Sequence, residues 1–306
     1  MTTQDDQVQV ELALDAHCNL GESPVWGGKT ETLYFVDIYE NKVRWFKPST
    51  GEASEVTLDQ PPGTIVPTSD PDRILVAGAR GILELDVPGR KLTGRVLAET
   101  PEEHGVDGYR FNDGKVTPKG TLLVGRMSTR WRDGEPGRLY RLDPGSSVLV
   151  EVMGPSEVML PNGIAWDESK PGVVYYIDSR TEAVRAYTAD AEGVPLRDPS
   201  TGQLGYRTVT HRPNDWKTVP DGMTIDADGR LWVAHGESGA VTQYDPETGE
   251  VLRTVALPAQ RPTACTFGGL GLEELYVTTR VEKGEGASPH HGGLFRIRIP
   301  RDLRTE

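Results

Sequence analysis

The sequence repeats one structural unit along nearly its whole length, and this repeat constrains the fold more than any other feature. Each copy reads as a short strand, a tight turn, an apolar strand, a brief polar gap and a strand with alternating apolar residues. Six copies begin near residues 21, 64, 112, 162, 221 and 263, a spacing of about 40 to 60 residues. A β-sandwich also contains short strands, but it does not predict a period close to one four-stranded blade. The repeat therefore predicts an all-β fold, a six-bladed β-propeller.

One further strand precedes the first copy. Residues 7–14 alternate in polarity, and their apolar side chains fall on one face. We expect this strand to complete the last blade and close the ring, which would remove exposed sheet edges. The prediction is a single domain over residues 1–306, with flexible termini at 1–6 and 301–306.

Composition and charge argue against several classes of function. The net charge of −13 disfavours nucleic acid as the main partner. No stretch approaches the roughly 18 apolar residues that a membrane span needs, so no membrane partner is expected. The N-terminal residues lack the pattern of a secretory signal, and Cys18 and Cys265 are too few for a disulfide framework. These features predict a reduced, cytoplasmic protein whose cysteines are small core residues; the oligomeric state is left open.

Polar residues recur where the first strand of a copy begins. They are Glu22, Asn112, Asn162 and Asp221. The innermost strands of a propeller line its central channel, so we expect these side chains to converge at one mouth. Two carboxylates and two carboxamides offer only oxygen ligands, which suit Ca²⁺, Mg²⁺ or Mn²⁺. Each residue also has a simpler interpretation, because Glu22 could cap a turn and Asn-Gly and Asp-Gly are common turn dipeptides.

The segment from Arg110 to Lys115 adds a second kind of polar group at this mouth. In an extended chain Arg110 and Asn112 point to the same side and Phe111 points to the other. A guanidinium and a carboxamide would then lie together, beside the strand that follows. The alternative is a solvated turn.

Several motifs resemble one known family. They are residues 20–26 (LGESPVW), 110–115 (RFNDGK), 161–166 (PNGIAW), 220–223 (PDGM), 231–234 (LWVA) and 266–269 (TFGG). Their sequences and order resemble the gluconolactonase / senescence marker protein (regucalcin) family of sugar lactonases, from about residue 10 to residue 300.

The resemblance implies both a metal site and a reaction. It implies one axial divalent cation (Ca²⁺, Zn²⁺, Mn²⁺, Mg²⁺ or Fe²⁺, with Ca²⁺ or Zn²⁺ favoured) held by Glu22, Asn162 and Asp221. It further implies that Arg110 and Asn112 bind the substrate, a small sugar lactone that is hydrolysed to the aldonic acid. Asp221 would handle the proton. This chemistry agrees with the residues, because a metal polarises the lactone carbonyl while a carboxylate transfers the proton.

One position departs from the family pattern. Arg130 stands where the family often has an acidic residue that contacts sugar hydroxyls. A carboxylate accepts hydrogen bonds, whereas Arg only donates them. We therefore expect Arg130 to bind a lactone other than glucono-1,5-lactone, one that is differently substituted, more acidic or shorter; alternatively, Arg130 points into solvent. Two other functions stay open at this stage: hydrolysis of another ester class such as organophosphates, with Arg130 and Trp131 at the rim, and a non-catalytic, calcium-binding regulatory propeller.

Overall fold

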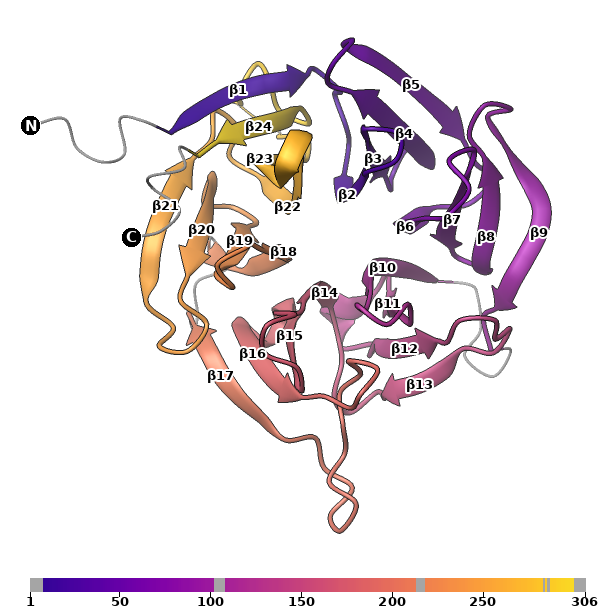
Figure 1. Ribbon diagram of the computed structural model, residues 1–306, viewed down its shortest axis with the longest axis vertical. Helices are drawn as coiled ribbons and strands as arrows, with labels where there is room; N and C mark the ends of the chain where they lie inside the picture. Colours follow the sequence, from indigo (N-terminus) through magenta and orange to yellow (C-terminus); the bar gives the residue numbers. More distant parts are fainter. Residues whose placement is uncertain (1–7, 102–107, 213–217, 283, 285–286, 300–306) are drawn as a thin grey trace, which may run out of the picture.

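Six four-stranded antiparallel sheets form a ring around a central axis (Figure 1). The computed structural model describes residues 8–101, 108–212, 218–282, 284 and 287–299. The predicted six-bladed propeller is confirmed. The termini predicted to be flexible, 1–6 and 301–306, lie outside the described residues. No helix in the described part of the chain is long and apolar enough to cross a membrane.

Each blade runs from an innermost strand near the axis to an outermost strand at the rim. The strands of the first three blades are β2 (Gly21–Gly27), β3 (Thr32–Asp37), β4 (Lys42–Lys47), β5 (Glu52–Thr57); β6 (Pro62–Pro67), β7 (Arg73–Gly78), β8 (Gly81–Asp86), β9 (Lys91–Glu99); and β10 (Tyr109–Val116), β11 (Leu122–Ser128), β12 (Arg138–Leu142), β13 (Val150–Met153). Those of the last three are β14 (Pro161–Ala165), β15 (Val173–Asp178), β16 (Ala183–Thr188), β17 (Tyr206–His211); β18 (Pro220–Ile225), β19 (Leu231–His235), β20 (Ala240–Tyr244), β21 (Val251–Ala256); and β22 (Pro262–Gly268), β23 (Glu274–Thr279), β24 (Leu294–Arg298), β1 (Gln9–Leu14). Short 3₁₀ helices are η3 (Trp131–Asp133), η4 (Ser179–Thr181) and η6 (Leu270–Leu272).

The N-terminal strand closes the ring, as predicted. β1 pairs antiparallel with β24 and is the outermost strand of the last blade (Figure 1). The register places Val10 opposite Ile297 and Leu12 opposite Phe295. The last blade therefore joins both ends of the described chain, and apolar pairs hold that junction.

The core lies between neighbouring blades. Second strands such as β11 are buried along their whole length, whereas an outermost strand such as β5 is mostly exposed. One core cluster joins Leu123 and Leu139 of the third blade to Val174 and Tyr176 of the fourth. Strands covered on both faces are expected to be continuously apolar, which explains why the middle strands carry the clearest sequence signal.

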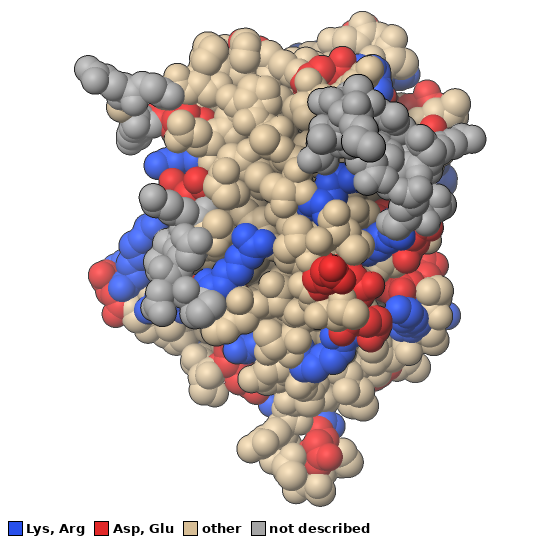
Figure 2. All heavy atoms as spheres, turned by 90° about the vertical axis from the view of Figure 1, so that its left-hand side faces the viewer, with Lys and Arg blue, Asp and Glu red and all other residues tan. Residues whose placement is uncertain are grey.

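Charged side chains of both signs are interspersed on the side of the ring seen in Figure 2. On the strands that close the ring, Glu274 forms ion pairs with two arginines. Its Oε1 lies 3.2 Å from Arg296 Nη1 and 3.1 Å from Arg298 Nε. On this face the net negative charge is therefore not gathered into one acidic surface.

Candidate metal centre and active site

All six innermost strands contain a β-bulge near their first residues. The pairing with the second strand shifts register beside Glu22 in β2, across Asn112 in β10, across Asn162 in β14 and across Asp221 in β18, with matching shifts in β6 and β22. A bulge turns side chains out of the regular alternation and is common beside active sites. The four predicted polar residues thus occupy equivalent, irregular positions in four blades.

The Asn-Gly and Asp-Gly dipeptides are parts of strands, so their interpretation as turns is wrong. They belong to β14 and β18. A Cβ on Gly163 would lie 2.6 Å from the Met223 nitrogen, and one on Gly222 would lie 2.6 Å from the Ala264 Cα. These glycines let the innermost strands of adjacent blades approach closely at the axis.

Three blades are joined at this point by a chain of buried hydrogen bonds. Arg110 Nη1 donates to Asn112 Oδ1 at 2.6 Å, and Asn112 Nδ2 donates to Asn162 Oδ1 at 2.8 Å. Asn162 Nδ2 then donates to Ser179 Oγ at 2.7 Å, and Ser179 Oγ donates to the Pro220 carbonyl at 2.6 Å. The structure therefore brings Arg110, Asn112 and Asn162 together as predicted. Ser179 completes the chain and was not predicted.

The two predicted carboxylates, Glu22 and Asp221, interact electrostatically. Burial raises the pKa of Glu22 well above its usual value, and the charges of Asp221 and Asp113 raise it further. Burial also raises the pKa of Asp221 to about 7, against the opposing influence of Arg280. Within the described residues, neither side chain accepts a hydrogen bond or joins an ion pair. Two nearby carboxylates without partners are costly to bury.

The donor set fits a hard divalent cation. The two carboxylates lack other partners among the described residues, and the Asn162 carbonyl oxygen has a second lone pair beyond the one facing Asn112. A dication would offset the charge of both carboxylates and accept oxygen ligands only. In the described part of the chain, no group of three or more His, Cys, Asp and Glu residues is placed to hold a metal ion, so a site at this point needs the Asn162 amide as its third donor.

A cavity of about 610 Å³ opens over this centre, and Asn162 and Asp221 lie in its lining. The other polar lining residues follow the second strands of four successive blades: Trp131 and Arg132 after β11, Ser179 and Arg180 after β15, Glu237 after β19, and Arg280 after β23. Loops at equivalent points of successive blades meet at the same mouth, so the wall of the cavity is built by the repeat.

A family model described as SMP-30/Gluconolactonase/LRE-like region matches residues 20–281. The chain belongs to this family. The match spans all four predicted polar residues and most of the ring, and it confirms the family that the motifs predicted.

Individual relatives agree with this assignment. Regucalcin of Xenopus laevis is 34% identical over 298 residues, which cover 95% of this chain and 94% of that protein. A luciferin-regenerating enzyme shares the fold with a TM-score of 0.82 and 28% identity, over 96% of each chain. A calcium-binding regucalcin from Agrobacterium tumefaciens has a TM-score of 0.82 at 24% identity, over 94% of this chain and 92% of that one.

Arg130, the residue that departs from the family pattern, does not line the cavity. The Arg130 side chain is 65% exposed and pairs with Glu135 at 2.5 Å. The next two residues, Trp131 and Arg132, line the cavity instead. A direct substrate role for Arg130 stays a prediction, and the geometry favours its neighbours.

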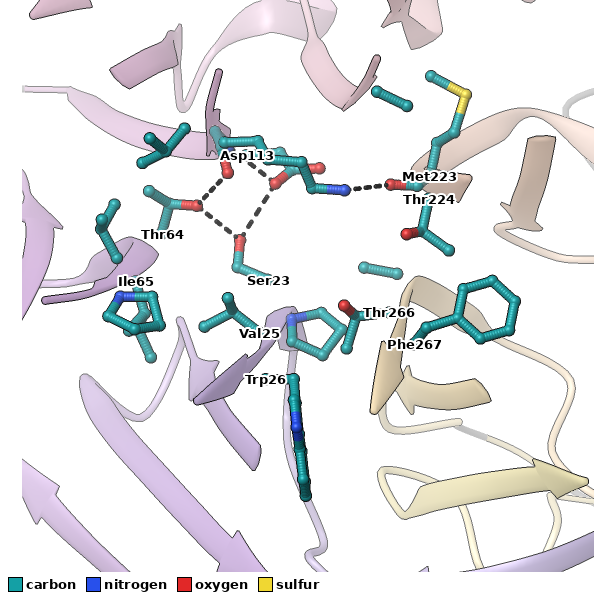
Figure 3. A pocket seen from close by; sticks show the side chains of 18 of the residues that line it. Ser23, Val25, Trp26, Thr64, Ile65, Asp113, Met223, Thr224, Thr266 and Phe267 are labelled. Atoms are coloured by element: carbon teal, nitrogen blue, oxygen red, sulfur yellow. Dashed lines mark hydrogen bonds between the residues drawn. The ribbon is translucent and has the colours of Figure 1, made fainter. Parts of the chain in front are cut away.

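A second cavity, of about 830 Å³, is lined at the opposite end of the innermost strands. Figure 3 shows the side chains around it. Its lining comes from later residues of the same innermost strands, including Ser23, Thr64, Asp113 and Lys115, with apolar side chains around them. Thr64 Oγ1 donates to Ser23 Oγ at 3.2 Å, and Lys115 Nζ donates to the Met223 carbonyl at 3.0 Å. These hydrogen bonds link the innermost strands of different blades.

The cysteines are structural, as predicted. Cys18 and Cys265 are free and buried, and burial raises the pKa of each thiol to about 12. Thiols with a raised pKa stay protonated, and a protonated thiol is a poor nucleophile.

Proposed function

We propose that this protein hydrolyses a small sugar lactone to the open-chain aldonic acid, with a divalent cation held by Glu22, Asn162 and Asp221. One observation carries the proposal: Asn162 and Asp221, from two blades, line a cavity, the charge of Asp221 acts on Glu22 of a third blade, and the two carboxylates have no hydrogen bond from a described residue. The family description, which includes gluconolactonase, supports it.

The reaction adds water across the ester bond of the lactone. The bound cation would polarise the carbonyl and lower the pKa of a water molecule. Asp221 faces the cavity, so its carboxylate can take the proton that the attacking water releases. The new C–O bond forms at the carbonyl carbon, the ring C–O bond breaks, and the proton passes to the departing alkoxide.

Arg110 and Asn112 hold the centre in place. The amide of Asn112 is bonded on both sides, because its Oδ1 accepts from Arg110 and its Nδ2 donates to Asn162 and to the Pro161 carbonyl. The bond from Asn112 fixes the orientation of the Asn162 amide, and with it the position of its carbonyl oxygen. We therefore propose that both residues position Asn162; direct contact of either with the lactone stays a prediction.

The choice of cation follows from the donors. Carboxylate and amide oxygens are the ligands of Ca²⁺, whereas the strongest Zn²⁺ sites include histidine or thiolate. Of the two cations favoured by the family resemblance, we propose Ca²⁺.

The decisive experiment is lactone hydrolysis by metal-stripped and metal-restored protein. Aldono-1,4- and 1,5-lactones are followed by acid release, with spontaneous ring opening subtracted. We expect activity to disappear with a chelator and return with one divalent ion. Glu22→Gln should need more of that ion, whereas Glu247→Gln, on an exposed surface carboxylate, should behave as wild type.

The other outcomes separate the remaining functions. Tight Ca²⁺ binding with no hydrolysis of any lactone would indicate a non-catalytic calcium-binding propeller. Faster hydrolysis of a phosphotriester than of any lactone would indicate a different ester class. Full activity in the chelated protein would exclude the proposed metal dependence.

A further inference from the structure

Arg132 is a guanidinium in the cavity wall with no carboxylate partner among the described residues. It belongs to η3, two residues after the exposed Arg130. Its guanidinium carbon lies 4.4 Å from the centroid of the Trp131 ring, and both residues line the cavity. Stacking on an aromatic face orients a guanidinium while leaving its N–H donors available.

Arg280 adds a second positive charge to the same wall. Its Nη2 atom lies 2.5 Å from Glu237 Oε1, and Arg261 Nε lies 3.2 Å from the other oxygen of Glu237. Two guanidinium groups thus share a single carboxylate, so this trio keeps a net positive charge. Arg280 lines the cavity together with Asp221.

The lining therefore combines positive walls with a floor that a bound dication would neutralise. Arg132 and Arg280 line the cavity, and Glu237 is the carboxylate in its wall. A neutral sugar lactone gives such a wall no charge to bind. Guanidinium groups bind carboxylates and phosphates through paired N–H donors, which makes them suited to an anionic substituent.

We propose that the lactone substrate carries an anionic group, bound by Arg132 and Arg280 while the ring carbonyl faces the metal centre. This inference rests on the proposed function and specifies its substrate class. The simplest such molecule is the lactone of a sugar diacid, which forms when the anomeric carbon of a uronic acid is oxidised. A phosphorylated aldonolactone carries the same charge chemistry. The reaction that supplies the substrate would then be an oxidation of an acidic sugar.

The test compares three lactones that differ in one substituent: glucaro-lactone with a carboxylate, 6-phosphoglucono-lactone with a phosphate, and neutral glucono-lactone. We expect kcat/KM for one of the anionic lactones to exceed that for the neutral lactone by about tenfold or more. Arg132→Ala should remove most of that preference through KM, and Arg132→Lys should restore part of it. Hydrolysis of the neutral lactone should fall by much less than hydrolysis of the anionic lactones.

A matched control removes a charge elsewhere. Arg95→Ala deletes an exposed guanidinium that pairs with Glu84 on the second blade, so it should leave the preference unchanged. Equal kcat/KM for all three lactones would overturn the inference, while hydrolysis itself would still support the proposed function. An equal loss of neutral and anionic lactone hydrolysis in Arg132→Ala would also overturn it.

Binding decides the inference without turnover. Titration calorimetry of the Ca²⁺-loaded protein compares glucarate with gluconate, which differ by one carboxylate. We expect tighter binding of glucarate, with the difference lost in Arg132→Ala. Selective glucarate binding without hydrolysis would uphold the anionic site and refute the lactonase function. Equal affinities for the two acids would refute the anionic site.

Discussion

The two ends of the central channel are built by the same strands but differ in chemistry. Glu22 and Ser23 are neighbours, yet Glu22 belongs to the proposed metal centre and Ser23 to the opposite cavity. Asn112 and Asp113 divide in the same way. The opposite cavity is the larger, about 830 Å³ against about 610 Å³. The proposed metal centre is therefore assigned by the state of its polar groups and not by the volume of its cavity.

The charges at the opposite end are satisfied within the protein. Asp113 Oδ1 accepts hydrogen bonds from the Gly114 nitrogen at 2.7 Å and from Ser23 Oγ at 3.4 Å (Figure 3). Burial raises the pKa of Asp113, and the nearby charge of Lys115 opposes that effect. Glu22 and Asp221 have no such partners in the described chain. Buried polar groups without protein partners are expected where a ligand binds, and this favours the end that holds Glu22 and Asp221.

The largest effect is expected from substituting the two carboxylates of the proposed metal centre, because one should lose turnover and the other metal affinity. Asp221→Asn keeps an oxygen ligand but cannot take a proton, so we expect kcat at saturating metal to fall by about 10³-fold. Glu22→Gln should mainly weaken metal binding, by about tenfold or more, with kcat at saturating metal largely retained. Steady-state kinetics at several metal concentrations, with calorimetry of metal binding, measures both.

Two results would contradict this division of roles. If Asp221→Asn retained wild-type kcat at saturating metal, Asp221 would be a ligand alone. If Glu22→Gln lost kcat as completely as Asp221→Asn at saturating metal, the two carboxylates would act as a unit and the proton could not be assigned to Asp221.

A smaller effect is expected from the hydrogen-bond chain behind the centre. Ser179→Ala removes the acceptor for Asn162 Nδ2 and the donor to the Pro220 carbonyl. Partners that orient metal ligands are worth about 10- to 100-fold in metal affinity, so we expect a loss near the lower value. Calorimetry of metal binding checks it.

Matched variants keep this second test specific. Ser179→Thr retains the hydroxyl and should recover most of the affinity. Ser200→Ala removes an exposed hydroxyl that bonds to its local turn at Asp198, so it should have no effect. An unchanged metal affinity in Ser179→Ala would show that the chain does not position Asn162.

Structure could be predicted from the sequence wherever burial produced an apolar run or residues shared one position in the repeat. Middle strands such as β19 are buried between blades and appear as apolar runs, so they could be predicted. The outermost strand β5 (EASEVT) is mostly exposed and is held by backbone pairing with β4, so its side chains carry little signal. Four residues of the candidate site could be predicted because they share one position in the repeat.

The residues of the cavity wall and the β-bulges have no comparable pattern in the sequence. Ser179 gains its role from Asn162 and Pro220, which lie on other strands. Asn-Gly at 162–163 has the same letters in a turn and in a bulged strand, and only the approach of β18 distinguishes them. Arg132 and Arg280 could have been found by aligning the residues that follow the second strand of each copy, because those positions meet at one mouth.

The smallest effect is expected from a charge at the rim of the opposite cavity. Glu168 lines that cavity and is exposed, as Arg132 is at the first. Glu168→Gln should change kcat/KM for any lactone, and the affinity for metal, by less than about twofold, and the free energy of unfolding by about 0.5 kcal/mol or less. Water screens an exposed charge at the far end of the channel from the centre. Kinetics and chemical denaturation of this variant beside Arg132→Ala compare the two rims directly. A tenfold loss of activity in Glu168→Gln would mean that the channel transmits charge from end to end, and the two mouths would then have to be treated as one site.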